Sequence, residues 1–238
     1  MKLKIMTFNI QSTRDYINRY FDYTLMAKVM KNVGADIIGV NEVRGKGTDK
    51  YYTDQIPNMA KYLGYDNYYF GNAIEVSGKG PYGNGFISKY KIISTEKIMI
   101  PDPLVKDEDA FYETRCILKM VVDVNNTPIT FIVTHIGLAK SEEGNAVSLL
   151  LEILKETSGK VVLMGDFNMT PDNPLVCEIA KVMDDSSKVI EGINYTYPSV
   201  KPVRKIDYIF TRNINVKSCK VEKIIASDHF PISIEVEL

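Results

Sequence analysis

The sequence predicts an α/β or α+β fold in which helices pack on the outside of β-sheets. Strand-like and helix-like patterns alternate along the chain from end to end. Two segments, 3–42 and 129–168, each read as a strand, a helix and a second strand followed by polar residues, which suggests two similar layers. No linker or low-complexity tract interrupts the 238 residues, so we expect one domain over residues 1–238.

The first of these units begins with an alternating segment at 3–10, which is typical of a strand and should end near Asn9. Apolar residues then recur at helical spacing, and Gly34 suits the position after a helix end, so a helix is expected at about 22–33. The run 36–40 is almost wholly apolar, the pattern of a strand covered on both faces, and Glu42 follows it. A carboxylate is therefore expected at a strand end.

The second unit has the same order. Residues 129–133 read as a strand that ends at His135. Ser141 is expected to cap a helix with an acidic first turn and a regular apolar stripe, and Gly159 to follow its end. A buried strand at 161–164 then leads to the polar sequence Gly-Asp-Phe-Asn.

The remaining elements complete the mixed pattern. We expect further strands near 67–73, 84–99, 114–124, 206–211, 215–225 and 231–237, and another helix at about 172–183. The glycine-rich segment 78–85 has no Gly-Lys-Ser/Thr sequence, so it is not a P-loop, and we interpret it as a flexible loop beside a cleft.

Composition limits the class of protein. Apolar residues make up 45% of the chain and charged residues 25%, which is typical of a globular protein. No apolar run approaches the roughly 20 residues needed to span a bilayer, and the N-terminus lacks the apolar core of a signal peptide. Three widely spaced cysteines, an odd number, favour free thiols over a disulfide framework. We therefore expect a cytoplasmic protein with no membrane span.

Charge and metal-binding residues narrow the chemistry. The 29 basic and 30 acidic residues give a net charge of −1, which argues against a broad nucleic-acid surface but leaves a local patch open. Two histidines and no Cys-x-x-Cys sequence exclude HExxH zinc enzymes and binuclear hydrolases with several histidine ligands. A bound metal would have mainly oxygen ligands, which suit Mg²⁺ or Mn²⁺.

Polar residues follow apolar runs at several points spread over the chain. They are Asn9, Glu42, His135, Asp166, Asn168, Asp207, Asp228 and His229. If they converge, three or four carboxylates would repel one another and need a divalent cation, which in turn stabilises charge on a phosphate oxygen. Taken singly, these residues are better explained as turn or cap residues, and the Asp228-His229 pair is equally well explained as a surface pair, so the prediction depends on their joint occurrence.

The motifs around these residues resemble the endonuclease/exonuclease/phosphatase superfamily over the whole chain. They are Thr7-Phe-Asn-Ile10, Asn41-Glu-Val43, Tyr82-Gly-Asn-Gly-Phe86, Thr134-His135, Gly165-Asp-Phe-Asn168, Ile206-Asp-Tyr-Ile209 and Ser227-Asp-His229, in the family's order. The resemblance implies a four-layer sandwich of two packed mixed β-sheets flanked by helices, with the active site at one edge of the sheets. It also implies Mg²⁺-dependent hydrolysis of a phosphate ester by an in-line water.

The resemblance assigns roles to individual residues. Glu42 is similar to the principal metal ligand, with Asn9 and Asp228 in or next to the coordination shell. Asp166 resembles the residue that orients or deprotonates the attacking water, and Asn168 the amide that holds this water or the phosphate.

The two histidines also match family positions. His229 with Asp207 resembles a dyad that acts as general base or as donor to the phosphoryl oxygen, and both roles stay open. His135 follows the Thr-His form of deoxyribonuclease-like, sphingomyelinase-like and phosphoinositide-phosphatase-like members, where it contacts the scissile phosphate. This form weighs against abasic-site repair. Asn84 and Arg115 are expected to line the cleft.

These inferences predict a Mg²⁺- or Mn²⁺-dependent phosphodiesterase acting on nucleic acid, a phospholipid head group or a small phosphodiester. The alternatives are a phosphomonoesterase of the phosphoinositide-phosphatase type and a non-catalytic binding module that keeps the fold. The short chain has little room for recognition insertions, which favours a compact substrate. Lys201, Arg204 and Lys205 either guide an anionic substrate or lie in a solvated loop. No obligatory protein partner is expected.

Overall fold

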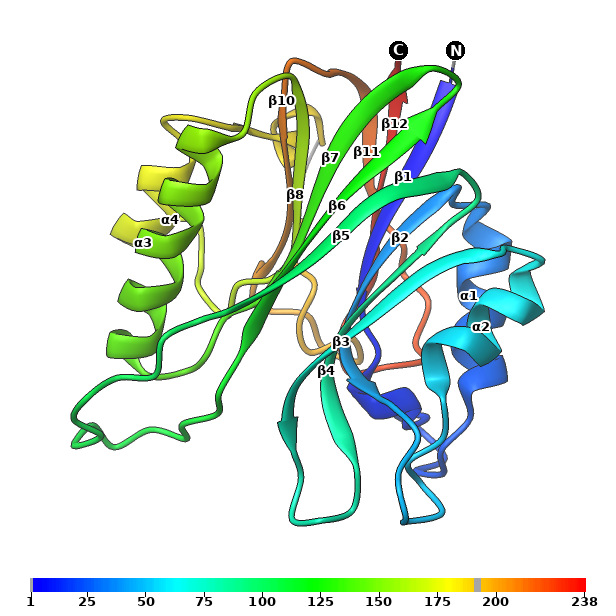
Figure 1. Ribbon diagram of the computed structural model, residues 1–238, viewed down its shortest axis with the longest axis vertical. Coiled ribbons are helices and arrows are strands. Elements are labelled where there is room, and N and C mark those ends of the chain that lie inside the picture. Colours follow the sequence, from blue (N-terminus) through cyan, green and yellow to red (C-terminus); the bar gives the residue numbers. More distant parts are fainter. Residues whose placement is uncertain (1, 191–193) are drawn as a thin grey trace.

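The computed structural model describes residues 2–190 and 194–238 and contains two six-stranded mixed sheets with helices on their outer faces (Figure 1). The first sheet has the order β11-β12-β1-β2-β4-β3 and the second β5-β6-β7-β8-β10-β9. The predicted fold class, two packed mixed sheets flanked by helices, is therefore confirmed.

The elements have the following bounds. The first sheet comprises β1 (Lys2–Asn9), β2 (Ile37–Arg44), β3 (Asn67–Glu75), β4 (Pro81–Ser88), β11 (Asn215–Val221) and β12 (Ile232–Glu237). The second comprises β5 (Lys91–Met99), β6 (Cys116–Val124), β7 (Thr127–His135), β8 (Lys160–Asp166), β9 (Asp184–Asp185) and β10 (Asp207–Arg212). The helices are α1 (Tyr23–Val33), α2 (Gln55–Leu63), α3 (Lys140–Glu156) and α4 (Pro174–Ile179), with 3₁₀ turns η1 (Gln11–Thr13) and η2 (Ser186–Val189).

Two strand-helix-strand units organise the molecule. β1 pairs with β2 and β7 with β8, both in parallel, and α1 and α3 make the crossovers. Local sequence sets their ends: Asp22 caps α1 by accepting from the backbone N–H groups of Thr24 and Leu25, and Gly34 ends it in the left-handed conformation. Parallel pairing matters for the site because it brings the carboxyl ends of these strands to one edge of each sheet.

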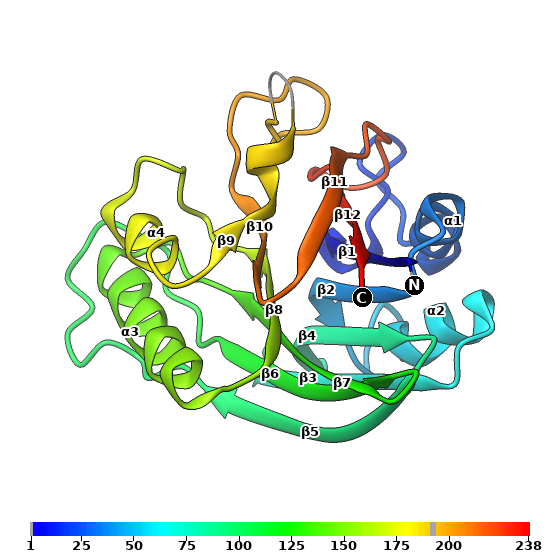
Figure 2. The same cartoon turned by 90° about the horizontal axis from the view of Figure 1, so that it is seen from above.

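Three apolar layers hold the elements together. The central layer lies between the two sheets, where the rings of Phe86 and Phe131 are 5.5 Å apart. One outer layer joins the first sheet to α1 and α2, and the other joins the second sheet to α3 and α4. Seen from above, these helix pairs lie on opposite sides of the sheets (Figure 2).

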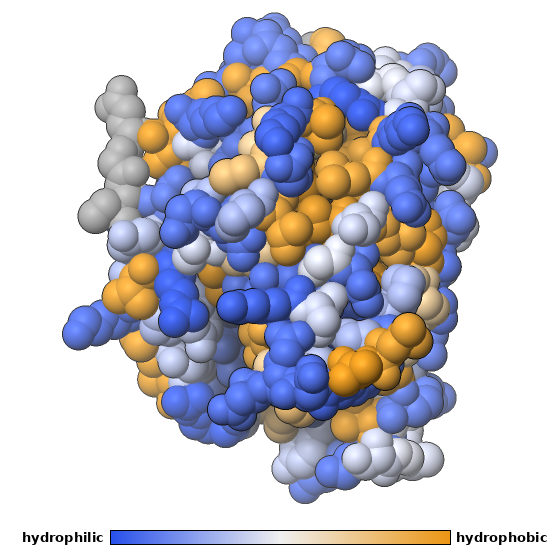
Figure 3. All heavy atoms as spheres, turned by 90° about the vertical axis from the view of Figure 1, so that its left-hand side faces the viewer, coloured by the Kyte–Doolittle hydropathy of each residue, from blue (hydrophilic) through white to orange (hydrophobic). Residues whose placement is uncertain are grey.

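The outer surface is mixed in character. Hydrophilic side chains are spread over the face that carries α3 and α4, and hydrophobic side chains show between them (Figure 3). Within residues 2–190 and 194–238, no helix is long and apolar enough to cross a membrane.

Strand alternation carries four of the predicted polar residues into the space between the sheets. Side chains two or four positions apart on a strand share a face. In each of four strands, a predicted polar residue lies two or four positions from an apolar residue of the central layer. The pairs are Ile5 and Asn9 in β1, Val133 and His135 in β7, Met164 and Asp166 in β8, and Ile209 and Asp207 in β10.

Several predicted boundaries were wrong. The segment 84–99 is two strands in different sheets, because the chain reverses at Lys89 in a turn where the Ser88 hydroxyl bonds both the N–H and the C=O of Tyr90. The predicted loop 78–85 is a hairpin turn followed by the first residues of β4, and the strand expected at 215–225 ends at Val221.

The helix predictions also need correction. The segment 172–183 contains only the six-residue α4, which begins after Asn173, whose side chain accepts from the N–H of Leu175. α3 begins at Lys140 with Ala139, not Ser141, in the cap position. It ends at Glu156, before the expected Gly159. The sequence prediction did not include α2, although Ile56, Met59, Ala60 and Leu63 recur at helical spacing before the left-handed Gly64.

Candidate active site

The site forms where β1, β2, β7 and β8 end, at the lower end of the molecule in Figure 1. In the second sheet, Asp166 is paired in register with His135 on one side and with Asp207 on the other. In the first sheet, Asn9 is paired with Asn41. Across the two sheets, Asn9 and Asp166 are in hydrogen-bond contact although 157 positions separate them in the sequence.

Asn9 joins the two sheets at this edge. Its amide nitrogen donates to Oε1 of Glu42 and to Oδ2 of Asp166, at 2.9 Å in each case. Its amide oxygen accepts from the backbone N–H of Gln11 at 3.1 Å. The buried amide thus holds a carboxylate from each sheet without adding negative charge.

The position of Glu42 depends on an irregularity within β2. Strict alternation would direct this side chain to the helix-packed side, with Ile38 and Val40. Instead, the pairing of β2 with β4 shifts between Val40 and Val43, and Glu42 has a φ of 57°. This bulge lets the carboxylate reach Asn9. The sequence had suggested that Glu42 follows the strand, but it lies within β2.

His229 forms a buried dyad with Asp207. Its Nδ1 is 2.9 Å from Oδ2 of Asp207, and its Nε2 is 3.6 Å from Oδ2 of Asp166. Burial disfavours the imidazolium, but the charges of Asp207 and Asp166 outweigh burial and raise the pKa of His229 to about 10. His229 is therefore a cation at neutral pH, with its Nε2–H directed at Asp166.

Asp166, in contrast to His229, tends toward its neutral form. Burial raises its pKa to about 7, although His229 and hydrogen bonds from the backbone of Asn168 and the side chain of Asn9 favour the carboxylate. A carboxyl group with a pKa near neutrality can both hold and release a proton at physiological pH.

His135 is neutral. Nη1 of Arg115 is 2.9 Å from its Nδ1, and since arginine always carries its protons, Nδ1 is the acceptor. Burial, the Arg115 charge and the His229 charge lower the pKa of His135 well below its usual value. Its Nε2 lies 3.5 Å from Oδ2 of Asp166 and 3.3 Å from the Asn168 amide nitrogen.

Asp228 approaches from the segment before β12. Its Oδ2 accepts from Nε2 of Gln11 at 3.0 Å, and its Oδ1 accepts from the hydroxyl of Ser227 at 3.0 Å. The neighbouring His229 points to Asp207, so this adjacent pair sends its two side chains to different partners.

A cleft of about 250 Å³ collects these groups. It is lined by Glu42, Arg115, His135, Leu138, Asp166, Asn168, Tyr197, Arg204, Ile206, Asp228 and His229. Seven of these were predicted site residues; of the other predicted ones, Asn9 and Asp207 lie behind the wall and contact it through Glu42, Asp166 and His229.

Two predicted substrate-facing residues lie elsewhere. Asn84 is buried behind the cleft, where its amide accepts from Asn41 and donates to the backbone carbonyl of Cys116. Lys205 is neither solvated nor available to a substrate, because it is buried in an ion pair with Asp185 at 2.6 Å. Arg204, in contrast, is on the cleft wall.

Several supporting residues were not among those predicted from the sequence. The amide oxygen of Asn41 accepts from the N–H of Asp166 at 3.0 Å, and its nitrogen donates to the carbonyl of Thr134 at 2.9 Å, which ties β2 to the second sheet. Alternation from Ile37 through position 39 would have indicated that Asn41 faces inward. Gln11 has no comparable signal, since it lies in the irregular segment η1.

The chemistry of the donors fits a hard divalent cation. Asp166, Asp207 and His229 each place a ligand atom within 4.8 Å of the others, and this buried group could bind a metal if His229 gave up a proton. No ion pair found among the described residues neutralises Glu42 or Asp228, which accept hydrogen bonds from the neutral groups of Asn9, Gln11 and Ser227. Uncompensated carboxylate oxygens are the ligands that Mg²⁺ and Mn²⁺ prefer.

Comparison with known proteins agrees with this fold. The chain is 24% identical over 252 residues to YbhP, an uncharacterised protein of Escherichia coli K12, with 99% of this chain and 96% of YbhP covered. An endonuclease/exonuclease/phosphatase of Beutenbergia cavernae has a similar fold, with a TM-score of 0.84 and 21% identity over 100% of this chain and 72% of the other. A mannosyl-6-phosphatase of Bacteroides thetaiotaomicron is also similar, with a TM-score of 0.73 and 18% identity over 99% of this chain and 100% of the other.

A match at the level of the family covers almost the whole chain, and it includes every motif noted above. Since residues 6–229 match the Endonuclease/Exonuclease/phosphatase family, the chain belongs to that family.

Proposed function

We propose that this protein is a Mg²⁺- or Mn²⁺-dependent phosphoester hydrolase, and specifically a phosphodiesterase. The observation that supports this most directly is the convergence, in one cleft, of carboxylates without cationic partners and of two histidines, one neutral and one protonated. A phosphate ester needs a cation for its non-bridging oxygens, a proton acceptor for the attacking water and a donor for the developing charge. The cleft holds residues suited to each task.

Glu42, Asn9 and Asp228 would hold the metal, which when bound supplies positive charge to the phosphoryl oxygens. Asp166, with a pKa of about 7, would orient the attacking water and accept its proton. Asn168 would position the same water or the phosphate. These roles follow the charges and hydrogen bonds of the side chains and match those implied by the sequence motifs.

The two histidines would act on the phosphate from their Nε2 atoms. His229, protonated at neutral pH, would donate a charge-assisted hydrogen bond to a phosphoryl oxygen, while Asp207 holds the ring from behind. His135 would donate a second, neutral hydrogen bond. For His229, its pKa of about 10 favours the donor role over the general-base role, because a base must be unprotonated at working pH.

Charge and size in the cleft favour a compact diester. Arg115 is already paired with Glu113 at 2.7 Å, so Arg204 and His229 are the cationic side chains on the wall that remain for the substrate. A diester carries one negative charge and a monoester close to two, so the limited positive charge suits the diester. The substrate would be a nucleic acid end, a phospholipid head group or a small phosphodiester, and free Cys116, Cys177 and Cys219 fit action in the reducing cytoplasm.

Monoester hydrolysis is the second candidate, since the mannosyl-6-phosphatase shares the fold. The two can be separated by measuring Mn²⁺-dependent hydrolysis of bis-p-nitrophenyl phosphate and p-nitrophenyl phosphate. Diester-selective cleavage that is lost in the Asp166→Asn and His229→Ala proteins, but kept in the exposed Asp66→Asn control, supports the proposal. A preference for the monoester would indicate a phosphatase. Silence on both substrates, together with no metal uptake by calorimetry, would indicate a binding module instead.

A further inference from the structure

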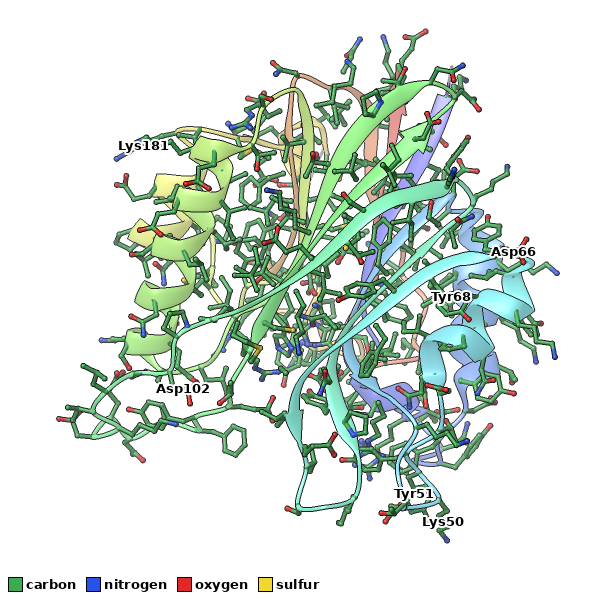
Figure 4. The ribbon with its side chains drawn as sticks, viewed as in Figure 1. Lys50, Tyr51, Asp66, Tyr68, Asp102 and Lys181 are labelled. Carbon is green, nitrogen blue, oxygen red and sulfur yellow. The ribbon has the colours of Figure 1, made fainter. Side chains whose placement is uncertain are left out.

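The connection between β5 and β6, residues 100–115, is fastened to the start of α3 on one flank of the cleft. Figure 4 shows this connection extending outward at the position of Asp102. The Glu108 carboxylate accepts from the backbone N–H groups of Lys140 and Ser141 at 2.8 and 3.0 Å. Nearer the cleft, Oε1 of Glu142 accepts from the N–H of Glu113 at 3.0 Å. The backbone of Glu113 is therefore fixed beside the active site.

One amino group of Arg115 connects Glu113 to His135. Nη1 of Arg115 lies 2.7 Å from Oε1 of Glu113 and 2.9 Å from Nδ1 of His135. The side chains of Arg115 and Glu113 are only 12% and 18% exposed, so water competes little for either contact. Nη1 of Arg115 forms a hydrogen bond with His135, whereas its contact with Oε1 of Glu113 is an ion pair without hydrogen-bond geometry. The carboxylate thus attracts the guanidinium group and keeps it beside the histidine.

This contact determines which nitrogen of His135 carries the proton. Because the guanidinium can only donate, Nδ1 must present its lone pair, and the neutral ring then carries hydrogen on Nε2. Nε2 is the atom that faces the cleft, 3.5 Å from Oδ2 of Asp166. If Arg115 turned away, the ring could place its proton on Nδ1 instead, and Nε2 would present a lone pair to the negatively charged phosphate.

We propose that Glu113 is a positioning residue for the reaction: it holds Arg115 against Nδ1 of His135 and so keeps the Nε2–H of His135 available to the phosphoester. This inference rests on the proposed phosphoester hydrolysis for its catalytic meaning, although the hydrogen-bond arrangement can be tested without any substrate. The competing explanation is that Glu113 only anchors the connection to α3, as Glu108 does.

The first test measures the tautomer of His135 by ¹⁵N NMR of the imidazole rings in the metal-free protein. The chain has only two histidines, so both rings can be assigned with a His229→Ala reference. The unmodified protein should show His135 with hydrogen on Nε2. Glu113→Gln should shift it toward a mixture with hydrogen on Nδ1, whereas the matched control Glu108→Gln, which changes a carboxylate of the same connection, should not.

A second variant guards against loss of the fold in Glu113→Gln. Arg115→Met removes the donor itself and should produce the same change of tautomer in a protein whose amide spectrum is otherwise preserved. If His135 keeps hydrogen on Nε2 in both variants, the inference is overturned. A change in Glu108→Gln as large as that in Glu113→Gln would also overturn it, because anchoring alone would then explain the effect.

A kinetic double-mutant cycle separates action through Arg115 from an independent effect. Loss of one charge-assisted hydrogen bond should lower kcat of Mn²⁺-dependent hydrolysis roughly 10- to 100-fold in Glu113→Gln, with little change in KM. The Glu113→Gln/Arg115→Met protein should be no slower than Arg115→Met. Multiplicative losses would overturn the inference. An inactive unmodified protein with the expected tautomer would instead contradict the proposed function and leave the role of Glu113 in fixing the tautomer supported.

Discussion

Replacing Asp207 by asparagine should neutralise His229. The dyad distance is 2.9 Å, and His229 is 4% exposed. The difference between the usual pKa of 6.5 and about 10 corresponds to about 5 kcal/mol in favour of the imidazolium. Burial lowers the pKa of His229 and so acts against this preference. Among the groups that raise its pKa, Asp207 has the largest effect. In Asp207→Asn the pKa of His229 should therefore fall well below 10.

The assay is an NMR titration of the two histidines in the metal-free protein. His229 should remain protonated through neutral pH in the unmodified protein and lose its proton near pH 10, whereas His135 should remain neutral. If its charge is needed in the transition state, kcat of Asp207→Asn should fall by about 10²- to 10⁴-fold. The control is Asp66→Asn, an exposed carboxylate beyond the end of α2 (Figure 4).

The same change should alter stability in a defined pH window. The pKa of His229 is raised on folding, so the stabilisation is complete below pH 6.5 and is lost as the pH rises through about 10. The free energy of unfolding should be higher for the unmodified protein than for Asp207→Asn. This difference should be largest near pH 6.5 and should shrink toward pH 10. A His229 that titrates identically in both proteins would refute the reasoning, because Asp207 would then not be its main charge partner.

Three further perturbations test the metal site and the core. Glu42→Gln should weaken Mn²⁺ binding by at least about tenfold in calorimetry; unchanged affinity would remove Glu42 from the metal site. Gly165→Ala should cost more than about 2 kcal/mol in urea unfolding, because Gly165 has a φ of 144° and a Cβ there would overlap a backbone carbonyl oxygen of β7. Gly144→Ala is its matched control and should stabilise α3 by about 0.5–1 kcal/mol, since nothing lies within 4 Å of the added Cβ. Phe131→Ala should cost about 3–5 kcal/mol because the ring is fully buried between the sheets, whereas the exposed Phe111→Ala should change stability by no more than about 0.5 kcal/mol.

Much of the site could be predicted because it continues regular patterns. His135, Asp166 and Asp207 keep the alternation of their strands, and parallel pairing brings the strand ends to one edge. These relations depend on local sequence and on the period of a β-strand, so one chain is sufficient to derive them. The two parallel units are also visible in the sequence for this reason.

What the sequence could not show depends on departures from those patterns or on distant partners. The carboxylate of Glu42 reaches Asn9 because of a bulge, and nothing in the sequence Asn-Glu-Val specifies one. The split at Ser88 was missed because the strands on either side follow each other without glycine or proline. Glu113 and Arg115 gain their meaning only when their segment lies against α3 and His135, and such contacts have no local signature.

One histidine of the site is protonated and the other neutral because their Nδ1 atoms face partners of opposite charge, a carboxylate for His229 and a guanidinium for His135. Both Nε2 atoms carry hydrogen and both face Oδ2 of Asp166, at 3.6 and 3.5 Å, beside the amide of Asn9 at 2.9 Å. The two imidazole contacts are longer than hydrogen bonds, so both Nε2–H groups are available for another acceptor. A phosphate oxygen in the cleft is a stronger acceptor for the two imidazoles and would draw their hydrogens away from Asp166. Binding of the phosphoester would thus place both donors on the group that gains charge, beside the carboxyl group of Asp166 that accepts the proton of the attacking water.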